Sequence, residues 1–217
     1  MDKIFAVWKP KGPTSHDIVN EVRRATGERR VGHAGTLDPL AEGILVIGVG
    51  REATKKLQTV VEKEKEYFAE IKLGEESSTD DEAGDKKAFK FSFPPSQGMV
   101  KSTLENFLGE IEQVPPQFSA VKVRGKPAHR RVRGGETVEL KSRRVKIREI
   151  RFLKYDWPYL TIRVVTGPGV YIRALARDIG RELKTGGYLK GLVRTRVGEY
   201  RKENAVEISK LKPIIEN

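Results

Sequence analysis

The chain has 217 residues, of which 37% are hydrophobic, so it is large and apolar enough to form a folded core. Its 42 Lys and Arg residues exceed its 30 Asp and Glu residues, giving a net charge of +12 that favours a nucleic-acid partner over a merely solvated basic surface. No cysteine is present, which excludes disulfides, thiolate nucleophiles and cysteine-ligated zinc or iron–sulfur sites.

Signals for metal binding, export and membrane insertion are also missing from the sequence. His16, His33 and His129 are too far apart along the chain to form a helical pair of metal ligands, so no metal site is expected. Residues 1–12 lack the apolar stretch of a signal peptide, and no run approaches the roughly 20 apolar residues of a membrane span. We therefore expect a cytoplasmic protein without a membrane partner.

The first predicted elements are a strand and a helix. Residues 2–8 are mostly apolar and predict a strand that ends at Pro10. Thr14 and Asp17 have the spacing of a capping box, and Gly27 is a typical helix end. The apolar residues between them repeat with a helical period: Ile18, Val19, Val22 and Ala25.

The middle of the chain is predicted to alternate strands with polar loops. Residues 27–43 are rich in glycine and lack an apolar period, which predicts a long loop. The apolar run 44–49 predicts a strand buried on both faces, whereas the alternation of 67–73 predicts a strand with one buried face. The acidic segment 75–85 predicts a solvated loop, and the spaced phenylalanines of 89–93 predict another strand.

A short helix and a strongly basic region follow. Ser102 and Glu105 have capping-box spacing, and the apolar residues as far as Ile111 predict an amphipathic helix. Residues 122–151 are intensely basic, and charged residues alternate with apolar ones in their second half. That half is predicted to form a strand with one wet, positive face.

The last part of the chain predicts two strands and two helices. Residues 159–166 have the pattern of a strand, and the glycines and proline of 167–169 predict a turn. Residues 172–183 predict an amphipathic helix, residues 192–200 a last strand, and residues 205–211 a short helix. Together these elements predict an α+β fold with a mixed, mostly antiparallel sheet flanked by helices.

The common cofactor-binding motifs are absent from the sequence. There is no G-x-x-x-x-G-K-[ST] phosphate loop, no G-x-G-x-x-G dinucleotide fingerprint and no serine nucleophile elbow. A catalytic site in this chain is therefore expected to use carboxylate, Tyr, Arg and His side chains, without a cofactor.

Three segments are candidates for such a site, and each also has a plain structural interpretation. The loop 32–40 carries His33 and Asp38, although Asp before Pro is also good turn chemistry. Residues 169–173 supply a Tyr and an Arg, or simply begin a helix, and Tyr67 is either functional or a core aromatic. A long loop inside a compact domain is usually functional, which favours a role for the first segment.

In chain order, these segments resemble the bacterial tRNA pseudouridine synthase B (TruB) family. The most specific segment is VGHAGTLDPLAEG at 31–43, which is similar to the family's G-H-x-G-x-L-D-P-x-A-x-G loop. One departure is His129, which stands where members usually carry an aromatic residue. The other matching segments are KPKGPTS at 9–15, GREATK at 50–55, KEY at 65–67, TDDEAG at 79–84, PPQFSAVK at 115–122, GVYIRA at 169–174 and LVRT at 192–195.

The resemblance implies a pseudouridine synthase fold in a single catalytic domain over residues 1–217. It also implies isomerisation of the T-loop uridine 55 of tRNA to pseudouridine, without a cofactor or metal. By this resemblance Asp38 is the nucleophile, Arg173 is its ion-pair partner, and Tyr67 stacks on the flipped base and helps to remove its C5 proton. Tyr171 is expected to pack beneath the site and orient it.

The resemblance also implies a set of RNA-binding residues. His33 is expected to fill the space that the flipped uridine vacates, and Leu192 is expected to line the base pocket. Binding through phosphates should be salt-dependent. The residues expected to hold the phosphates are Lys9, Lys122, Arg194 and the rest of the basic stretch 122–151.

The chain is expected to be a monomer that binds the T arm, without the C-terminal PUA RNA-binding domain of many members. Two alternatives stay open at this point. One is a guide-dependent pseudouridine synthase subunit, against which the expected lack of a PUA domain argues. The other is a non-catalytic RNA-binding or RNA-chaperone protein, since folds outlive functions. The presence of Asp38, Tyr67 and Arg173 argues against this second alternative.

Overall fold

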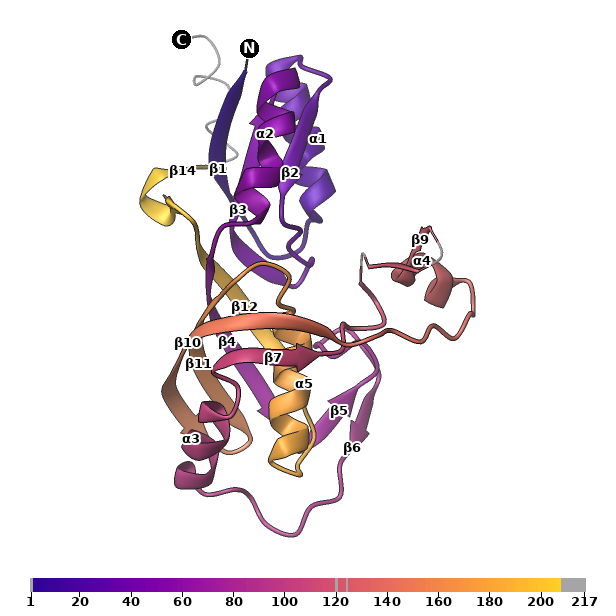
Figure 1. Ribbon diagram of the computed structural model, residues 1–217, viewed down its shortest axis with the longest axis vertical. Coiled ribbons are helices and arrows are strands. Elements are labelled where there is room, and N and C mark those ends of the chain that lie inside the picture. Colours follow the sequence, from indigo (N-terminus) through magenta and orange to yellow (C-terminus); the bar gives the residue numbers. More distant parts are fainter. Residues whose placement is uncertain (1, 120, 124, 208–217) are drawn as a thin grey trace. The chain divides into compact units, whose positions relative to one another are not determined.

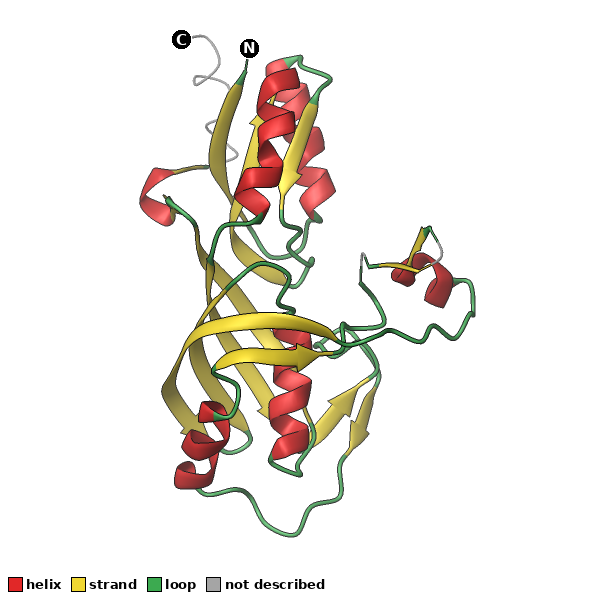
Figure 2. Cartoon of the chain, viewed as in Figure 1, coloured by secondary structure: helices red, strands yellow, loops and turns green. Residues whose placement is uncertain are grey.

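A computed structural model describes residues 2–119, 121–123 and 125–207 of the chain. Helices and strands are mixed along the chain (Figure 2). The strands pair in both parallel and antiparallel directions. The backbone divides into two compact units, to which strands β4 (Lys65–Leu73) and β12 (Gly187–Val197) both contribute. The units are Met1–Phe68 with Leu192–Asn217, and Ala69–Gly191. The observed elements confirm the α+β class.

The first unit is organised around β3, the most buried strand in it (Figure 1). Strands β1 and β2 pair with β3 in antiparallel directions, whereas β12 pairs with β3 in parallel and β14 pairs with β1 in parallel. The elements of this unit, besides parts of β4 and β12, are β1 (Lys3–Lys9), α1 (Ser15–Thr26), β2 (Val31–Ala34), β3 (Ala41–Val49), α2 (Arg51–Val61), β13 (Tyr200–Arg201), the 3-10 helix η1 (Lys202–Asn204) and β14 (Ala205–Val206).

Helix α1 begins and ends where the sequence predicts. The Thr14 side chain accepts a hydrogen bond from the Asp17 amide, and the Asp17 carboxylate in turn accepts from the Thr14 amide. At the other end Gly27 adopts the left-handed conformation, with φ of 67°, which glycine adopts without a Cβ clash. These capping residues, which are local in the sequence, therefore set the two ends of the helix.

Helix α1 and helix α2 cover opposite faces of β3. The apolar side of α1 packs against Leu45 and Ile47, whereas Leu57 and Val60 of α2 pack with Ile44. Side chains alternate along a strand, so successive residues of β3 meet different helices. This arrangement confirms the prediction that the strand is buried on both faces.

The second unit contains a sheet in which β10 lies between β7 and β11, and both neighbours are antiparallel to it. Helix α5 approaches the start of β12 closely, because an added Cβ at Gly180 would lie 2.4 Å from the Gly187 nitrogen. The elements, besides parts of β4 and β12, are β5 (Glu75–Ser77), β6 (Lys86–Ala88), α3 (Gln97–Glu105), β7 (Gly109–Gln113), β8 (Lys122–Val123), β9 (Lys126–Pro127), α4 (Ala128–Arg133), β10 (Arg143–Asp156), β11 (Tyr159–Thr166) and α5 (Ile172–Glu182).

Several predicted elements agree with the structure, but the long loop over 27–43 was wrong. Strand β2 and the start of β3 both lie within that range. The pairing of β2 with β3 buries Val31 and Ala34, and this pairing cannot be seen in a segment with so many glycines. Helix α2 was not predicted, although Ala53, Leu57 and Val60 repeat with a helical period.

The region around 89–111 also differs from the prediction. Residues 89–93 form no strand, and Phe91 and Phe93 are exposed, because no neighbouring strand pairs with them. Helix α3 is capped by Ser96 rather than Ser102. Ile111, which was placed on that helix, lies in β7 opposite Val145 of β10.

The last predicted elements need smaller corrections. The strand expected at 192–200 begins five residues earlier, as β12, and ends at Val197. The helix expected at 205–211 is wrong over Ala205 and Val206, which form β14. Residues 208–211 lie outside the described residues.

Candidate active site

Asp38 lies half-buried in the loop that joins β2 to β3. Leu37, the residue before it, is held through both its amide and its carbonyl. The Ser15 hydroxyl accepts a hydrogen bond from the Leu37 amide and donates one to the Leu37 carbonyl, both at 2.9 Å. The residue after it is held by the Gly12 amide, which donates to the Pro39 carbonyl at 2.8 Å. The first residue of α1 and the segment before that helix therefore fix the backbone on both sides of Asp38.

Two buried cations fasten the ends of the same loop. The Lys9 ammonium donates to the Ala41 carbonyl at 2.7 Å, at the end that leads into β3. The Arg194 guanidinium donates to the Gly35 carbonyl at 2.9 Å, at the end that leaves β2. Hydrogen bonds from charged donors are stronger than neutral ones, so the loop has a rigid frame at both ends.

Lys9 also acts on Asp38 through its charge. Burial lowers the pKa of Lys9, and the negative charge of Asp38 is the largest influence that acts in the opposite direction. This attraction is mutual, so the ammonium group favours the ionised form of the carboxylate. Lys9 therefore supports a negative charge on Asp38 within the first unit.

The burial of Lys9 and Arg194 does not fit their expected role as phosphate-binding residues. Lys9 is 0% exposed and Arg194 is 2% exposed, and the donors of both face backbone carbonyls. Neither is presented to an RNA backbone in this structure, and both instead fasten the Asp38 loop. The side chain of Lys122 lies outside the described part of the structure.

The three remaining candidates of the first unit lie on three different strands. His33 on β2 has a buried Nδ1 without a hydrogen-bond partner, and burial and the charge of Arg194 lower the pKa of this histidine. Leu192 on β12 is half-buried opposite Ala41 of β3. Tyr67 on β4 is 6% exposed. The low pKa favours a neutral imidazole at His33, which is suited to stacking rather than to holding phosphate.

Lys65 is a residue near the loop to which the sequence assigned no role. It shares the buried face of β4 with Tyr67, and its ammonium donates to the Val61 and Lys63 carbonyls at 2.7 and 2.8 Å. Its Cε lies 3.6 Å from where a Cβ of Gly35 would be. Burial, together with the charge of Arg194, lowers the pKa of Lys65 to about 8. The sequence feature that could have indicated Lys65 is a lysine on the apolar side of an alternating strand.

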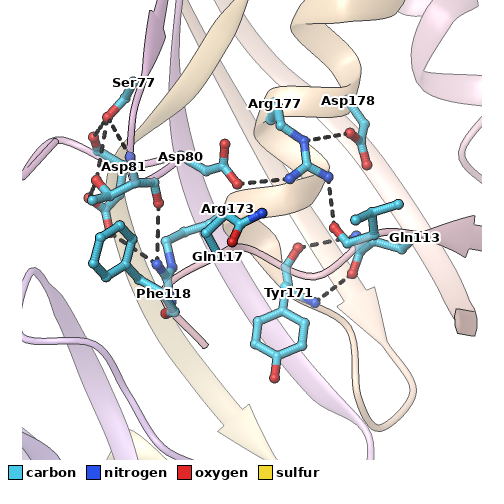
Figure 3. A network of polar contacts seen from close by, with 12 residues as sticks. Ser77, Asp80, Asp81, Gln113, Gln117, Phe118, Tyr171, Arg173, Arg177 and Asp178 are labelled. Atoms are coloured by element: carbon cyan, nitrogen blue, oxygen red, sulfur yellow. Dashed lines mark hydrogen bonds and ion pairs between the residues drawn. The ribbon is translucent and has the colours of Figure 1, made fainter. Parts of the chain in front are cut away.

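In the second unit, Arg173 lies in the first turn of α5 and is 7% exposed. Its guanidinium donates to the Thr79 carbonyl at 3.3 Å and the Phe118 carbonyl at 3.0 Å, and one nitrogen lies 3.6 Å from the Asp81 carboxylate (Figure 3). Asp81 accepts a further bond from the Ala83 amide. These contacts hold the guanidinium in one orientation.

The acidic segment 75–85 is not the solvated loop that the sequence predicts, because its first residues form β5 and arginines of α5 contact Asp80 and Asp81. Arg177 donates to Asp80 at 2.8 Å and to Asp178 at 2.9 Å. Burial raises the pKa of Asp80, and the charges of Arg177 and Arg173 act against this effect. Asp81 is itself 9% exposed. Two arginines one helical turn apart thus hold neighbouring residues of the loop.

Tyr171 is the residue directly before α5, and its backbone is held by the Gln113 side chain. Its ring packs against a small cluster that includes Val121 and Val138.

Asp38 and Arg173 belong to different units, so their expected ion pair stays a prediction. Among the described residues, no group of three or more His, Asp or Glu side chains is placed to hold a metal ion. In the same part of the chain, no helix has the length and apolar character to cross a membrane.

Comparison with known proteins decides the family. The model of the TruB family pseudouridylate synthase N-terminal domain matches residues 23–172, which is more than half of the chain. The chain belongs to the TruB family. A second model, of the tRNA pseudouridylate synthase B C-terminal domain, matches residues 173–216.

Curated TruB relatives resemble the chain over nearly its whole length. The tRNA pseudouridine synthase B of Thermobifida fusca is 47% identical over 97% of this chain and 74% of the relative. The protein of the same name from Leifsonia xyli is 46% identical over 97% of this chain and 72% of the relative. The similarity therefore covers all of the segments from which the family resemblance was drawn.

Solved structures agree with the assignment to a pseudouridine synthase fold. A chain in the structure of a Cbf5–Nop10–Gar1 complex superposes with a TM-score of 0.74 and 26% identity. A chain of the archaeal box H/ACA sRNP Nop10–Cbf5 complex superposes with a TM-score of 0.72 and 26% identity. This chain is covered to 97–98% in both, but it spans only 53% of those chains.

Proposed function

We propose that this chain is a tRNA pseudouridine synthase that isomerises the T-loop uridine of tRNA, with Asp38 as the nucleophile. The observation that carries the proposal is the half-buried Asp38 on a loop held by Ser15, Gly12, Lys9 and Arg194, in a chain of the TruB family. A preorganised carboxylate beside a buried cation is suited to attack and then leave. The curated relatives, named tRNA pseudouridine synthase B, support tRNA as the substrate.

The reaction balances without an added reactant. The bond from uracil N1 to C1′ of the ribose breaks, and the uracil turns while it stays bound. A bond then forms from C5 to C1′, the proton of C5 is lost, and N1 takes up a proton. In this proposal the Asp38 carboxylate bonds to C1′ as the bond from N1 to C1′ breaks, and the bond between Asp38 and C1′ breaks in turn as C5 bonds to C1′. The uridine has to leave the RNA stack first, at a cost of roughly a few kcal/mol.

The other residues have supporting roles in this proposal. Arg173 pairs with the Asp38 carboxylate, which its planar guanidinium can grip with two hydrogen bonds. Tyr67 stacks on the flipped base and helps to remove the C5 proton, while Tyr171 packs beneath it. His33 fills the space that the uridine leaves in the RNA. The lowered pKa of His33 supports this role, because a neutral ring stacks without the cost of burying a charge.

The RNA side of the proposal concerns the T arm and the cell compartment. Leu192 lines the base pocket, and the exposed part of the basic stretch 122–151 contacts phosphates. Single-stranded loops with splayed bases are what proteins read best in RNA, which supports the T loop as target. We place this activity in the cytoplasm and in a monomer with one catalytic domain.

The test is conversion of an unmodified tRNA transcript by the purified chain, with chelator present and no cofactor. Pseudouridine is mapped at single-nucleotide resolution. We expect product at the T-loop uridine, and none with Asp38→Asn, which keeps the side-chain size but removes the charge. A well-folded protein that binds the tRNA and yields no product would contradict the proposal and favour a non-catalytic RNA-binding protein.

A guide-dependent synthase is the second candidate, because two of the similar solved chains come from an archaeal box H/ACA sRNP complex and from an H/ACA RNP bound to a substrate RNA. The same experiment separates the two candidates. Product formed without any guide RNA supports the stand-alone enzyme. Product that appears only after addition of partner proteins and a guide would support the second candidate.

A further inference from the structure

The start of α5 carries Tyr171 and Arg173, and it lacks an ordinary helix cap. Tyr171 is the N-cap residue, its φ and ψ of −99° and 113° are extended, and its side chain makes no capping hydrogen bond. The first N–H groups of a helix have no partner within it, so another group has to fix the chain there. The end of β7 supplies such a group in this structure.

Gln113 holds the backbone of Tyr171 with both ends of its amide. The Tyr171 amide donates to Gln113 Oε1 at 2.9 Å, and Gln113 Nε2 donates to the Tyr171 carbonyl at 3.2 Å (Figure 3). The same carbonyl accepts the first helical bond, from the Leu175 amide at 3.0 Å. The side chain therefore imitates a neighbouring strand and fixes the peptide from which α5 begins.

Gln113 is itself held firmly. It is 1% exposed and lies on β7 opposite Arg143 of β10. Val114, the residue directly after β7, contacts α5 as well, because its carbonyl accepts from Arg177 at 2.8 Å. The end of β7 and the residue after it thus contact Tyr171 and Arg177, which are six residues apart, and Arg173 lies between them. A rotation or shift of the first turn would move its guanidinium.

We propose that Gln113 is a positioning residue for the pseudouridine synthase reaction, which aims Arg173 and Tyr171 by clamping the Tyr171 backbone. The inference rests on the proposed function only where its test measures kcat and KM. Gln113 touches neither the substrate nor the reacting carboxylate in this scheme. It acts through the first turn of α5, where a misplacement of about 1 Å can cost on the order of 100-fold in rate.

The experiment compares Gln113→Met with the wild type and with Gln117→Met. Met has nearly the length of Gln, so the site stays filled while both hydrogen bonds are lost. Gln117 is a matched control, because its amide also donates to a backbone carbonyl, that of Val138 at 2.9 Å, but its side chain is exposed and that carbonyl lies outside α5. Three quantities are measured: kcat, KM for the tRNA transcript, and hydrogen exchange of the Tyr171 amide without RNA.

We expect Gln113→Met to lower kcat at least about tenfold with KM changed less than threefold, and to speed exchange of the Tyr171 amide. Gln117→Met should change neither. Unchanged kcat, unchanged exchange, or an equal loss in both variants would overturn the inference, since a merely structural role lowers stability without this split.

Gln113→Glu carries the test if the Met variant does not fold. It keeps the acceptor for the Tyr171 amide but turns a negative oxygen toward the Tyr171 carbonyl, so a similar loss of kcat is expected, and full activity would overturn the inference. Hydrogen exchange is measured without RNA, so it does not depend on catalysis. A wild type that makes no product would contradict the proposed function, but exchange of the Tyr171 amide would still test whether Gln113 clamps that backbone.

Discussion

At the scale of single residues, the Asp38 loop is held by groups that are distant in sequence. Ser15 bonds to both sides of the Leu37 peptide, and Lys9 and Arg194 bond to the carbonyls at the two ends. A carbonyl that is buried without a donor costs about 1–3 kcal/mol, so each cation also satisfies a polar group that the fold buries. The loop that carries Asp38 is thereby attached to rigid strands.

Lys65 gives this region a pH dependence whose sign follows from its pKa. The pKa of about 8 in the folded chain lies below the ordinary value of 10.5, so between these values the unfolded chain binds more protons. The free energy of unfolding should therefore rise with pH in this window. We expect the wild type to gain stability relative to Lys65→Met between pH 8 and 10.5, as measured by urea denaturation.

The reference for this measurement is Lys55→Met, which removes an exposed lysine from α2. The difference between the wild type and Lys65→Met should change with pH much more than the difference between the wild type and Lys55→Met. Parallel curves for the two variants would show that the burial of Lys65 has no effect on its protonation.

At the scale of elements, a single glycine lets β12 lie against β3. Gly43 pairs with Arg194, and its φ of 119° is one that side chains rarely allow. A Cβ at Gly43 would lie 2.2 Å from the Arg194 carbonyl oxygen, which is backbone and has no room to move. The parallel pairing that brings Arg194 to the Asp38 loop therefore requires glycine here.

Gly43→Ala should be far more destabilising than a glycine substitution with the same backbone strain but no clash. Gly109 supplies that control, since its φ is 90° and an added Cβ would meet nothing within 4 Å. Gly109→Ala should cost about 1–2 kcal/mol, and Gly43→Ala at least about 3 kcal/mol more, by urea denaturation. Equal losses in the two variants would contradict the close approach of β12.

The predicted elements that agree with the structure are those with local signals. Helix α1 has its capping box and its terminal glycine within the segment itself, and β4 shows its alternation within nine residues. Strand β2 was missed because its evidence lies in β3, its partner, and not in its own glycine-rich sequence. The strand expected at 89–93 has the alternation but lacks the partner.

At the scale of the whole molecule, the chain has a net charge of +12, but neighbouring acidic residues neutralise part of the positive charge on β10. Arg144 lies 3.2 Å from Glu112, Lys146 pairs in register with Glu110, and Arg163 lies 3.0 Å from Glu149. Acidic residues on β7 and β10 thus neutralise part of the charge on the face that the sequence predicted to be wet and positive. The RNA contacts should come from the remaining exposed cations.

Binding of tRNA should weaken steeply with salt, because each neutralised phosphate contributes roughly 0.7–0.9 to the slope of log affinity against log salt. The exposed neighbours Arg143 and Arg144 allow a matched test. Arg143→Gln should lower this slope by about 1, and Arg144→Gln should lower it less, since Glu112 already balances that charge. The slopes are measured by titration at several salt concentrations, and equal slopes for both variants would contradict the charge map.

The sequence by itself determined the family of this protein and its locally encoded elements. The order of its motifs is enough to place Asp38, Tyr67 and Arg173 in a TruB chain, because each motif is a short run of residues that needs no partner to be read. The capped helix α1 and the doubly buried β3 follow from signals within a few positions.

Only the tertiary structure decided what holds these residues in place. Lys9 and Arg194 look like surface cations in the sequence, but they are buried because the fold brings them to carbonyls 32 and 159 positions away. Gln113 shows no signal of its own, and its role depends on a peptide 58 positions away. A buried polar side chain is defined by the groups that satisfy it, and the fold alone selects those groups.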